Sequence, residues 1–368
     1  MTAAGREADA GDGRSAAGIV DRAMRALTAG DGLRTVWLSG IAIGLALAVT
    51  GFLILLAGKN PLDAYWALIK GAAGTPGRLA FALNKSTPYI LAGVGVALCF
   101  RAKVINIGAE GQIAVGGIAA TFVALKMLAL PPALLIAAAL IAGAACGAAW
   151  ASLAAIIRLK RGVHEVLCTL LLNFVGVLLV SEALHGDMGE PGAGFPQSPL
   201  LERAAWLPKL LAGTDLHIGI LFAVLAVMGG HVLLWRTTFG FRLRVLGASP
   251  QAASYVGISA PRCIFGVMTL AGALAGFAGG IEVLGVHYRL IEGFSAGFGF
   301  NAVAVALIAS VNPIAVLPAG LFFGFLEAGA LAMQREVGVP SSLVLVIQGL
   351  TMVFVLCAIG IGARHQRV

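Results

Sequence analysis

The sequence is dominated by apolar runs of about twenty residues, the length an α-helix needs to cross the hydrocarbon core of a bilayer. Hydrophobic residues make up 59% of the 368 residues and charged residues only 11%, against roughly 25% charged residues in a soluble domain. The 50 glycines would weaken helices in water, but in lipid they let helix backbones approach closely. The predicted fold class is therefore an all-α polytopic membrane protein.

Ten apolar runs are expected to form transmembrane helices, with bounds defined to within several residues. They are 36–57, 86–100, 104–125, 132–157, 163–184, 216–235, 261–284, 298–310, 313–333 and 341–363. The run at 298–310 is too short to cross unless it is re-entrant, broken or joined to its neighbour. The stretches 58–85 and 185–215 are expected to be non-helical and external.

Lysine and arginine set the expected orientation, because cytoplasmic loops carry the excess of positive charge. Sixteen of the 25 lie on the side that holds both termini, so both termini are expected in the cytoplasm. The chain then divides into a flexible tail (1–35), a transmembrane domain (36–363) with a cytoplasmic loop at 236–260, and a C-terminus (364–368). The positive charges form no stripe, so nucleic acid is not an expected partner.

Spans two to five begin outside and spans seven to ten begin inside. This order allows two inverted halves, although no repeat is visible at the level of residues.

Motifs for catalysis and nucleotide binding are absent from the sequence. There is no G-x-x-x-x-G-K-[ST], no H-E-x-x-H and no G-x-S-x-G, and the five cysteines have no paired spacing. We therefore predict no catalytic residues, no metal ligands and no P-loop ATP site on this chain.

Polar residues at the start of the third run are candidates for a substrate pathway. Asn106, Glu110 and Gln112 lie within seven residues, and an unpaired carboxylate at mid-bilayer costs about 2.5 kcal/mol or more. Two interpretations stay open: Glu110 contacts the substrate, or it pairs with Arg101 or Lys103 near the interface and fixes packing.

Other intramembrane polar residues also have two interpretations. Asn173 either lines the pathway or makes an interhelical hydrogen bond. Glu327 and Gln348 are placed to pair across two helices. Three small-residue motifs, at 143–147, 272–276 and 320–324, are expected to be helix contacts.

The short run at 298–310 begins with Phe298, Phe300 and Asn301. Aromatic rings with an amide on a re-entrant turn suit a flat ring or a sugar face, but they also suit an interfacial anchor. The run ends at Asn312-Pro313, where proline breaks the helix.

The loop at 236–260 contains the signals of a short helix. Ser249 is the expected N-cap, Pro250 the first helical residue, and Gly257 the stop after residues 251–256. Such a helix can dock in a groove of a soluble partner, or it can be ordinary surface.

This loop resembles the cytoplasmic loop of ABC-importer permeases of the ribose and branched-chain amino acid type. The residues that carry the resemblance are Gly247, Ala248, Ser249, Pro250, Ala252, Ala253, Tyr255, Gly257 and Ile258. Residues 106–112, 165–173, 338–340 and 347–349 are similar to motifs of the nucleoside-type branch. One departure is His164, where related sequences tend to carry asparagine.

The resemblance implies a ten-helix permease of the bacterial inner membrane that pairs with a second homologous permease. Two cytoplasmic ATP-binding subunits, which hold ATP and Mg, would dock on the coupling residues Gly247, Ser249, Pro250, Ala252, Ala253, Tyr255, Gly257 and Ile258. An external binding protein would deliver nucleosides, purine bases or simple sugars.

Two other classes of function remain open. An ion-coupled secondary transporter needs intramembrane ionisable groups, which Glu110, Glu165, Glu282 and Glu327 supply. An intramembrane enzyme would turn over substrate without any partner.

Overall fold

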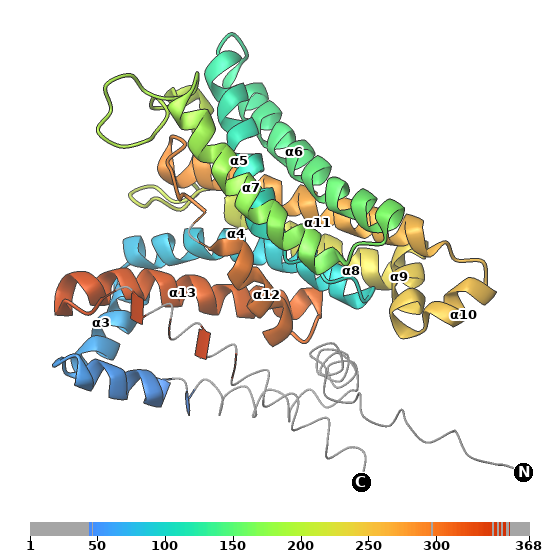
Figure 1. Cartoon of the computed structure of the whole chain (residues 1–368). Helices are drawn as coiled ribbons and strands as arrows, with labels where there is room; N and C mark the ends of the chain where they lie inside the picture. Colours follow the sequence, from blue (N-terminus) through green and yellow to red (C-terminus); the bar gives the residue numbers. More distant parts are fainter. Residues whose placement is uncertain are drawn as a thin grey trace, which may run out of the picture.

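The computed structural model describes residues 44–45, 47–295 and 297–340, and residues 342, 343, 346, 349, 350 and 353. Over this part of the chain the fold is a helix bundle, and the only strand pairing is two isolated bridges (Figure 1). After an apolar helix at Leu47–Leu56, the helices are α3 (Pro61–Ala73), α4 (Pro76–Arg101), α5 (Ala109–Lys126), α6 (Pro132–Arg161), α7 (Glu165–His185), the 3-10 turn η1 (Arg203–Ala205), α8 (Gly219–Arg236), α9 (Thr238–Ala248), α10 (Pro250–Tyr255), α11 (Ala260–Glu282), the π-turn η2 (Val283–His287), α12 (Phe298–Ile308) and α13 (Pro313–Val337).

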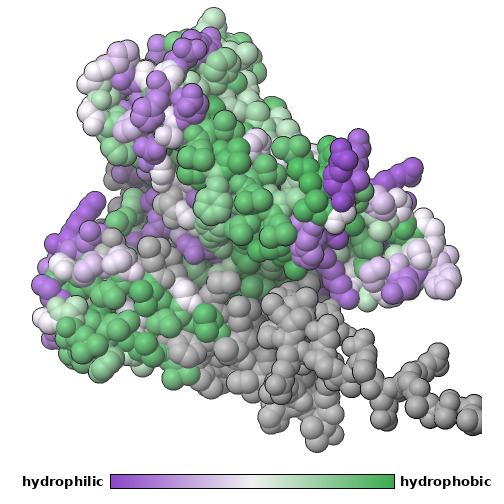
Figure 2. Space-filling model, in the orientation of Figure 1, coloured by the Kyte–Doolittle hydropathy of each residue, from purple (hydrophilic) through white to green (hydrophobic). Residues whose placement is uncertain are grey.

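Five of these helices are long and apolar enough to cross a membrane: α6, α7, α8, α11 with η2, and α13. Figure 2 shows hydrophobic side chains across the middle of one face and hydrophilic side chains at its ends, one of which carries α9 and α10. An apolar belt between polar ends is the surface that a bilayer requires. The predicted all-α polytopic membrane class is confirmed.

The expectation of a non-helical stretch at 58–85 is wrong. α3 fills its first part, and α4 begins ten residues before the run that was expected to hold it. Both helices start at a polar capping residue followed by proline, at Asn60-Pro61 and Thr75-Pro76. The side-chain oxygens of the two caps accept hydrogen bonds from backbone N–H groups of the first turn. Charge counting placed Lys85 outside, but in α4 it is buried.

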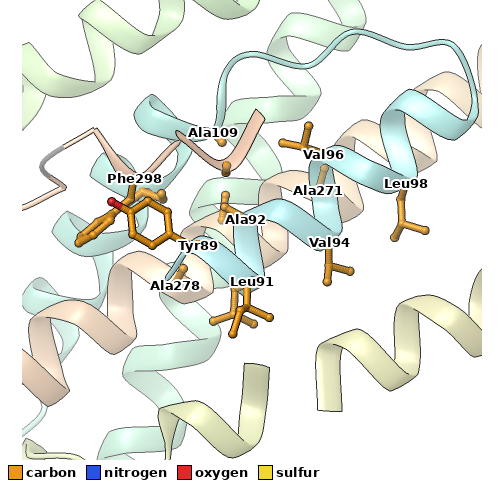
Figure 3. Packing of buried hydrophobic residues seen from close by; sticks show 14 of the residues in the cluster. Tyr89, Leu91, Ala92, Val94, Val96, Leu98, Ala109, Ala271, Ala278 and Phe298 are labelled. Atoms are coloured by element: carbon orange, nitrogen blue, oxygen red, sulfur yellow. The ribbon is translucent and has the colours of Figure 1, made fainter. Parts of the chain in front are cut away.

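The core forms around α4, which packs against α11, α12 and α13. Figure 3 shows Tyr89, Ala92 and Val96 of α4 beside residues of α11 and α12. The small-residue motifs lie at helix contacts, as predicted. A Cβ on Gly147 of α6 would lie 2.3 Å from the Gly272 oxygen of α11, and one on Gly324 of α13 only 2.1 Å from the Ser86 hydroxyl of α4. Helices this close require glycine at the crossing.

Two irregular segments, 102–108 and 288–295, interrupt the bundle, and the helices after them, α5 and α12, touch at their N-terminal ends. A Cβ on Gly299 of α12 would lie 2.0 Å from the backbone nitrogen of Glu110 in α5. The neighbouring Gly111 packs against Trp150 and Asn173, near the middles of α6 and α7. Both discontinuous segments therefore meet at mid-depth in the bundle.

The two halves of the bundle correspond in element order. α4 and α11 pack on each other and precede the two irregular segments, α6 packs on α11, and α13 packs on α4. α6 and α13 both end at a glycine of positive φ, Gly162 and Gly338, each followed by valine. This order agrees with the expected inverted halves, although most of 341–363, the expected counterpart of α7, and the first part of 36–57 lie outside the described residues.

The short run at 298–310 forms α12, and α13 begins at Pro313, as predicted; Asn312 caps it. Because α12 begins at mid-depth, eleven residues are enough to reach one end of the bundle.

Candidate functional site

The loop between α8 and α11 folds into the two short helices α9 and α10. Ser249 accepts a hydrogen bond from the Ala252 nitrogen at 3.2 Å, Pro250 is the first residue of α10, and Gly257 has φ +74°. The predicted start and stop of this helix are confirmed. α9 was not predicted, because its glycines at 240 and 247 resemble loop residues; in the structure both mark close backbone contacts.

The coupling residues divide between an exposed and a packed set. Tyr255 is 90% exposed, and Ala252 and Gly257 are also on the surface, whereas Ala253 is buried and Ile258 half-buried. α10 lies at one extreme of the molecule (Figure 1). An exposed aromatic side chain on an anchored helix is typical of a docking surface.

Gly247 places α9 directly on the end of α4. A Cβ at this position would lie 1.9 Å from the Arg101 oxygen, so only glycine permits the contact. α9 is therefore packed directly against the start of the segment that follows Arg101.

Those residues, 102–108, leave the helix at the end of α4, and α7 supplies hydrogen-bond partners for the backbone nitrogens of Ile105 and Ile107. The Ile107 nitrogen donates to the Thr169 hydroxyl at 3.4 Å, and the Asn173 amide donates to the Ile107 oxygen at 2.7 Å. The Asn173 oxygen accepts from the Gly111 nitrogen at 2.8 Å. Asn173 thus makes an interhelical contact, and it fixes a backbone that would otherwise be unsatisfied in lipid.

Asn106 and Gln112 lie buried in the same junction. The Asn106 oxygen accepts from the Gly108 nitrogen at 2.9 Å and from the Gln112 amide at 3.2 Å. Among the described residues, the Asn106 Nδ2 and Gln112 Oε1 atoms have no hydrogen-bond partner. These two atoms retain the capacity to bind a polar group.

Glu110 caps α12 rather than pairing with Arg101 or Lys103 as one interpretation expected. Its oxygens accept from the Ser295 hydroxyl at 2.6 Å and from the backbone nitrogens of Gly297 and Gly299 at 3.1 and 2.7 Å. The first N–H groups of a helix have no partner within it and carry partial positive charge, which a carboxylate satisfies. Glu110 thereby joins the two discontinuous segments.

The three candidate residues on α12 face different surroundings. Phe298 is fully buried, 5.0 Å from the Tyr89 ring in an edge-on contact and 5.1 Å from the Lys85 ammonium. Phe300 is 40% exposed. The Asn301 amide donates to the Tyr89 hydroxyl at 3.5 Å.

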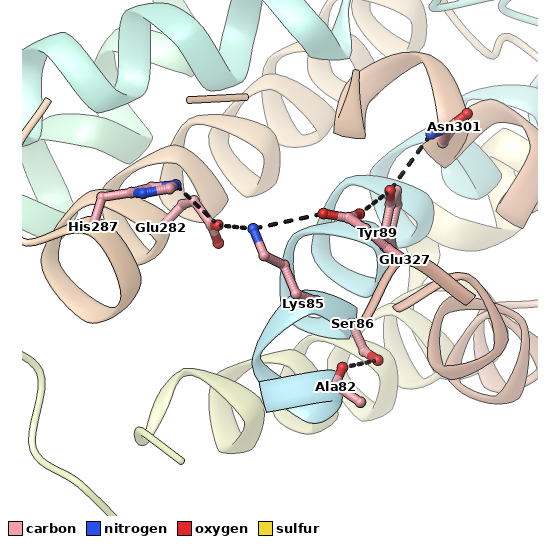
Figure 4. A network of polar contacts seen from close by, with 8 residues as sticks. All are labelled: Ala82, Lys85, Ser86, Tyr89, Glu282, His287, Asn301 and Glu327. Atoms are coloured by element: carbon pink, nitrogen blue, oxygen red, sulfur yellow. Dashed lines mark hydrogen bonds and ion pairs between the residues drawn. The ribbon is translucent and has the colours of Figure 1, made fainter. Parts of the chain in front are cut away.

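Next to α12 lies an ionic cluster that sequence analysis did not assemble (Figure 4). The Lys85 ammonium lies 3.0 Å from a Glu282 oxygen and 3.6 Å from a Glu327 oxygen. The Tyr89 hydroxyl donates to Glu327 at 2.5 Å, and His287 lies 3.5 Å from Glu282. We call Lys85, Tyr89, Glu282, His287 and Glu327 the ionic cluster.

The exposure of these carboxylates is unequal. The Glu282 side chain is 1% exposed and that of Lys85 8%, but Glu327 retains 19%. A charged group within a membrane domain faces a partner, water or another subunit, because exposure to acyl chains is costly. The signal in the sequence is Lys85 itself, a lone charge at the edge of the expected run 86–100. The expected partner of Glu327, Gln348, lies outside the described residues.

The segment between α7 and α8 is largely irregular, as predicted, and contacts the second discontinuous segment. The Ser198 nitrogen donates to the Leu290 oxygen at 2.8 Å, and Arg289 pairs with Glu190 at 3.3 Å. Near the end of this segment Lys209 forms an ion pair with Asp215 at 2.6 Å, which raises the pKa of the lysine.

Among the residues that the structure describes, no three His, Cys, Asp or Glu side chains are grouped as metal ligands.

Comparisons with known proteins show that this sequence is similar to those of transport proteins. The family described as "Branched-chain amino acid transport system / permease component" matches residues 78–356. The glucose ABC transporter permease protein TsgB13 of Haloferax volcanii is 35% identical over 84% of each chain. The guanosine ABC transporter permease protein NupP of Bacillus subtilis is 33% identical, over 86% of this chain and 91% of its own. A second guanosine permease protein of the same organism, NupQ, is 27% identical over 66% of this chain and 78% of its own. No solved structure matches significantly.

Proposed function

This chain belongs to the permease family of branched-chain amino acid transport systems, and we propose that within it the chain carries nucleosides or related purine and sugar compounds. It is a multi-pass transport subunit of an ABC transporter, and ATP is hydrolysed by a separate subunit. The guanosine name of NupP supports a nucleoside, while the glucose name of TsgB13 keeps simple sugars open.

The observation that carries the proposal is the anchored, outward-facing helix α10. Tyr255 is 90% exposed, and Ala253 on the opposite side of the helix is buried. We propose that the ATP-binding subunit, with its ATP and Mg, receives this helix in a groove. The bacterial inner membrane with both termini in the cytoplasm fits this arrangement, because the ATPase and α10 then share one side.

Coupling follows from the contact of Gly247 with Arg101. Movement of α9 and α10 would displace segment 102–108, which is bonded to α7, and then the junction where Glu110 caps α12. Both discontinuous segments would shift together. Rocking of one half against the other around a mid-depth site is the usual mechanism of alternating access.

We place the substrate pathway beside α12. Glu327 and Asn301 are partly exposed and both bond to the Tyr89 hydroxyl, which places a carboxylate and an amide together, and Phe300 adds an exposed aromatic ring on the same helix as Asn301. Such a set suits the hydroxyls of a pentose and the flat face of a base. In the junction, Asn106 and Gln112 offer further polar atoms, and the proposed role of Glu110 and Asn173 is to position both helices.

The remaining partners are a second permease and an external binding protein. NupP and NupQ, two guanosine permease proteins of one organism, support a pair of homologous subunits. The irregular segment between α7 and α8, bonded to segment 288–295, is the proposed landing surface for the binding protein.

Tyr255→Asp tests the proposal. We expect the variant to insert and melt like the native permease, because Tyr255 makes little internal contact, but to lose co-purification with its ATPase and nucleoside uptake. The measurements are a pull-down of the tagged ATPase and uptake of labelled guanosine and glucose into proteoliposomes with ATP.

Leu128→Asp is the matched control, since it places the same charge on an exposed residue of the loop between α5 and α6. It should retain the ATPase. Normal ATPase capture and uptake by Tyr255→Asp would contradict the assignment of α10.

A further inference from the structure

Two arginines from different elements share one tryptophan ring at the end of α8. The Arg244 guanidinium carbon lies 4.6 Å from the centre of the Trp235 ring, and that of Arg101 lies 5.5 Å from it. Arg244 also lies 5.9 Å from the Phe241 ring. Arg101 comes from the last turn of α4 and Arg244 from α9, so the fold itself brings these like charges together.

The pair lacks a counter-ion in the part of the chain that the structure describes. The ion pairs there involve other cations, and none joins a carboxylate to Arg101 or Arg244. The Nε atoms of both arginines are buried without a hydrogen-bond partner. Two cations held this close repel each other, and cation–π contacts with one ring do not neutralise them. An anion is the missing component.

The place of Trp235 indicates which anion is available. The outward face of α8 is an apolar stripe that a bilayer would cover, and Trp235, 41% exposed, is its last member. The other members of the stripe are Leu221, Leu225, Met228 and Val232. Tryptophan at the end of a lipid-facing stripe marks the level of the lipid headgroups.

We propose that Arg101 and Arg244 bind the phosphate of an anionic phospholipid, with its acyl chains along the α8 stripe. The guanidinium fork suits phosphate oxygens, and basic pockets between transmembrane helices on the cytoplasmic side are suited to such headgroups. Because Arg101 also contacts Gly247, the lipid would sit where α9 meets α4. The site is independent of which solute is transported.

The test compares lipid binding by the full-length permease and by Arg101→Gln/Arg244→Gln. Native mass spectrometry counts bound phosphatidylglycerol as it is titrated into detergent-solubilised protein, with phosphatidylcholine as the neutral lipid. Each arginine near a membrane surface contributes about fivefold to binding, so the double variant should bind about 25-fold more weakly. Binding of phosphatidylcholine should stay unchanged.

Arg203→Gln is the matched control, because Arg203 lies 5.9 Å from the Trp206 ring in the α7–α8 segment, away from α8's Trp235. It should bind phosphatidylglycerol like the native protein. Arg101→Lys/Arg244→Lys keeps both charges but loses the planar forks, so it is expected to bind phosphatidylglycerol with intermediate affinity. This variant replaces the glutamine variant in the test if the latter is unstable. Equal phosphatidylglycerol binding by native and double-variant proteins would overturn the proposal, as would displacement of the lipid by an equal concentration of inorganic phosphate.

Discussion

The two glutamates of the ionic cluster differ in exposure, and this difference separates their roles. Glu327 is the more exposed and lies 3.6 Å from Lys85, whereas Glu282 is enclosed and lies 3.0 Å from it. Removing the charge of Glu327 leaves one lysine beside one carboxylate. Removing that of Glu282 leaves a buried cation without its nearest partner.

We therefore expect Glu327→Gln to keep its melting temperature but to raise the guanosine concentration for half-maximal uptake about tenfold. A carboxylate that accepts a ribose hydroxyl binds it more strongly than an amide does, by about 1.4 kcal/mol. The measurement is initial uptake rate against guanosine concentration in proteoliposomes that contain the complete transporter.

Glu282→Gln is the matched control for this prediction. It should lower the melting temperature, since breaking a buried pair on one side costs about 3 kcal/mol or more. If Glu327→Gln transports like the native protein, the pathway does not pass Glu327.

Sequence reasoning at the scale of residues located the polar groups but not their partners. Glu110, Asn173 and Glu327 were singled out because a polar side chain in lipid requires a partner. Their actual partners are backbone groups of α12, the backbone of segment 102–108, and Tyr89 with Lys85. These partners are up to 238 residues away in sequence, and no local pattern encodes such contacts.

At the scale of elements, the contact between α9 and α4 carries the coupling argument. Gly247→Leu would force these two elements apart, because its Cβ alone would lie 1.9 Å from the Arg101 oxygen. We expect the variant to retain its ATPase, since α10 is not changed, but to lose most uptake. ATP hydrolysis by the reconstituted complex should then no longer depend on the substrate-loaded binding protein.

Ala248→Leu is the matched control, because the adjacent Ala248 is exposed. It should couple normally. Native uptake by Gly247→Leu would show that α9 does not transmit the movement of the ATPase.

Elements were predictable where local chemistry defines their ends. Ser249-Pro250 and Asn312-Pro313 each place a capping side chain before proline, and helices begin there as expected. The same signal is present at Asn60-Pro61 and Thr75-Pro76, but the expectation for 58–85 was based on hydropathy alone, and the charged residues of this stretch lower its apolar content. Hydropathy does not predict the start of α4, because the ion pair with Glu282 allows the charged Lys85 to be buried within the bundle.

On the scale of the whole molecule, the question is which energy source moves the two halves. An ion-coupled transporter must release and rebind its ion at an intramembrane carboxylate during each cycle. Glu110 is bonded to three donors of the α12 start, and Glu282 lies between Lys85 and His287. Both carboxylates contribute to the structure that joins the halves, so cyclic discharge of either would weaken it.

The chain offers a different input, because α10 protrudes at one end and connects through Gly247 and segment 102–108 to the central junction. We therefore expect uptake in proteoliposomes to require ATP on the side of α10 and to persist when ionophores collapse proton and sodium gradients. Omission of ATP, or a variant ATPase that binds but does not hydrolyse it, should abolish accumulation. Accumulation driven by an imposed ion gradient without ATP would instead assign Glu327 to ion coupling. Glu327 is the most accessible of these carboxylates, so its partly exposed side chain can exchange a proton without disrupting the junction.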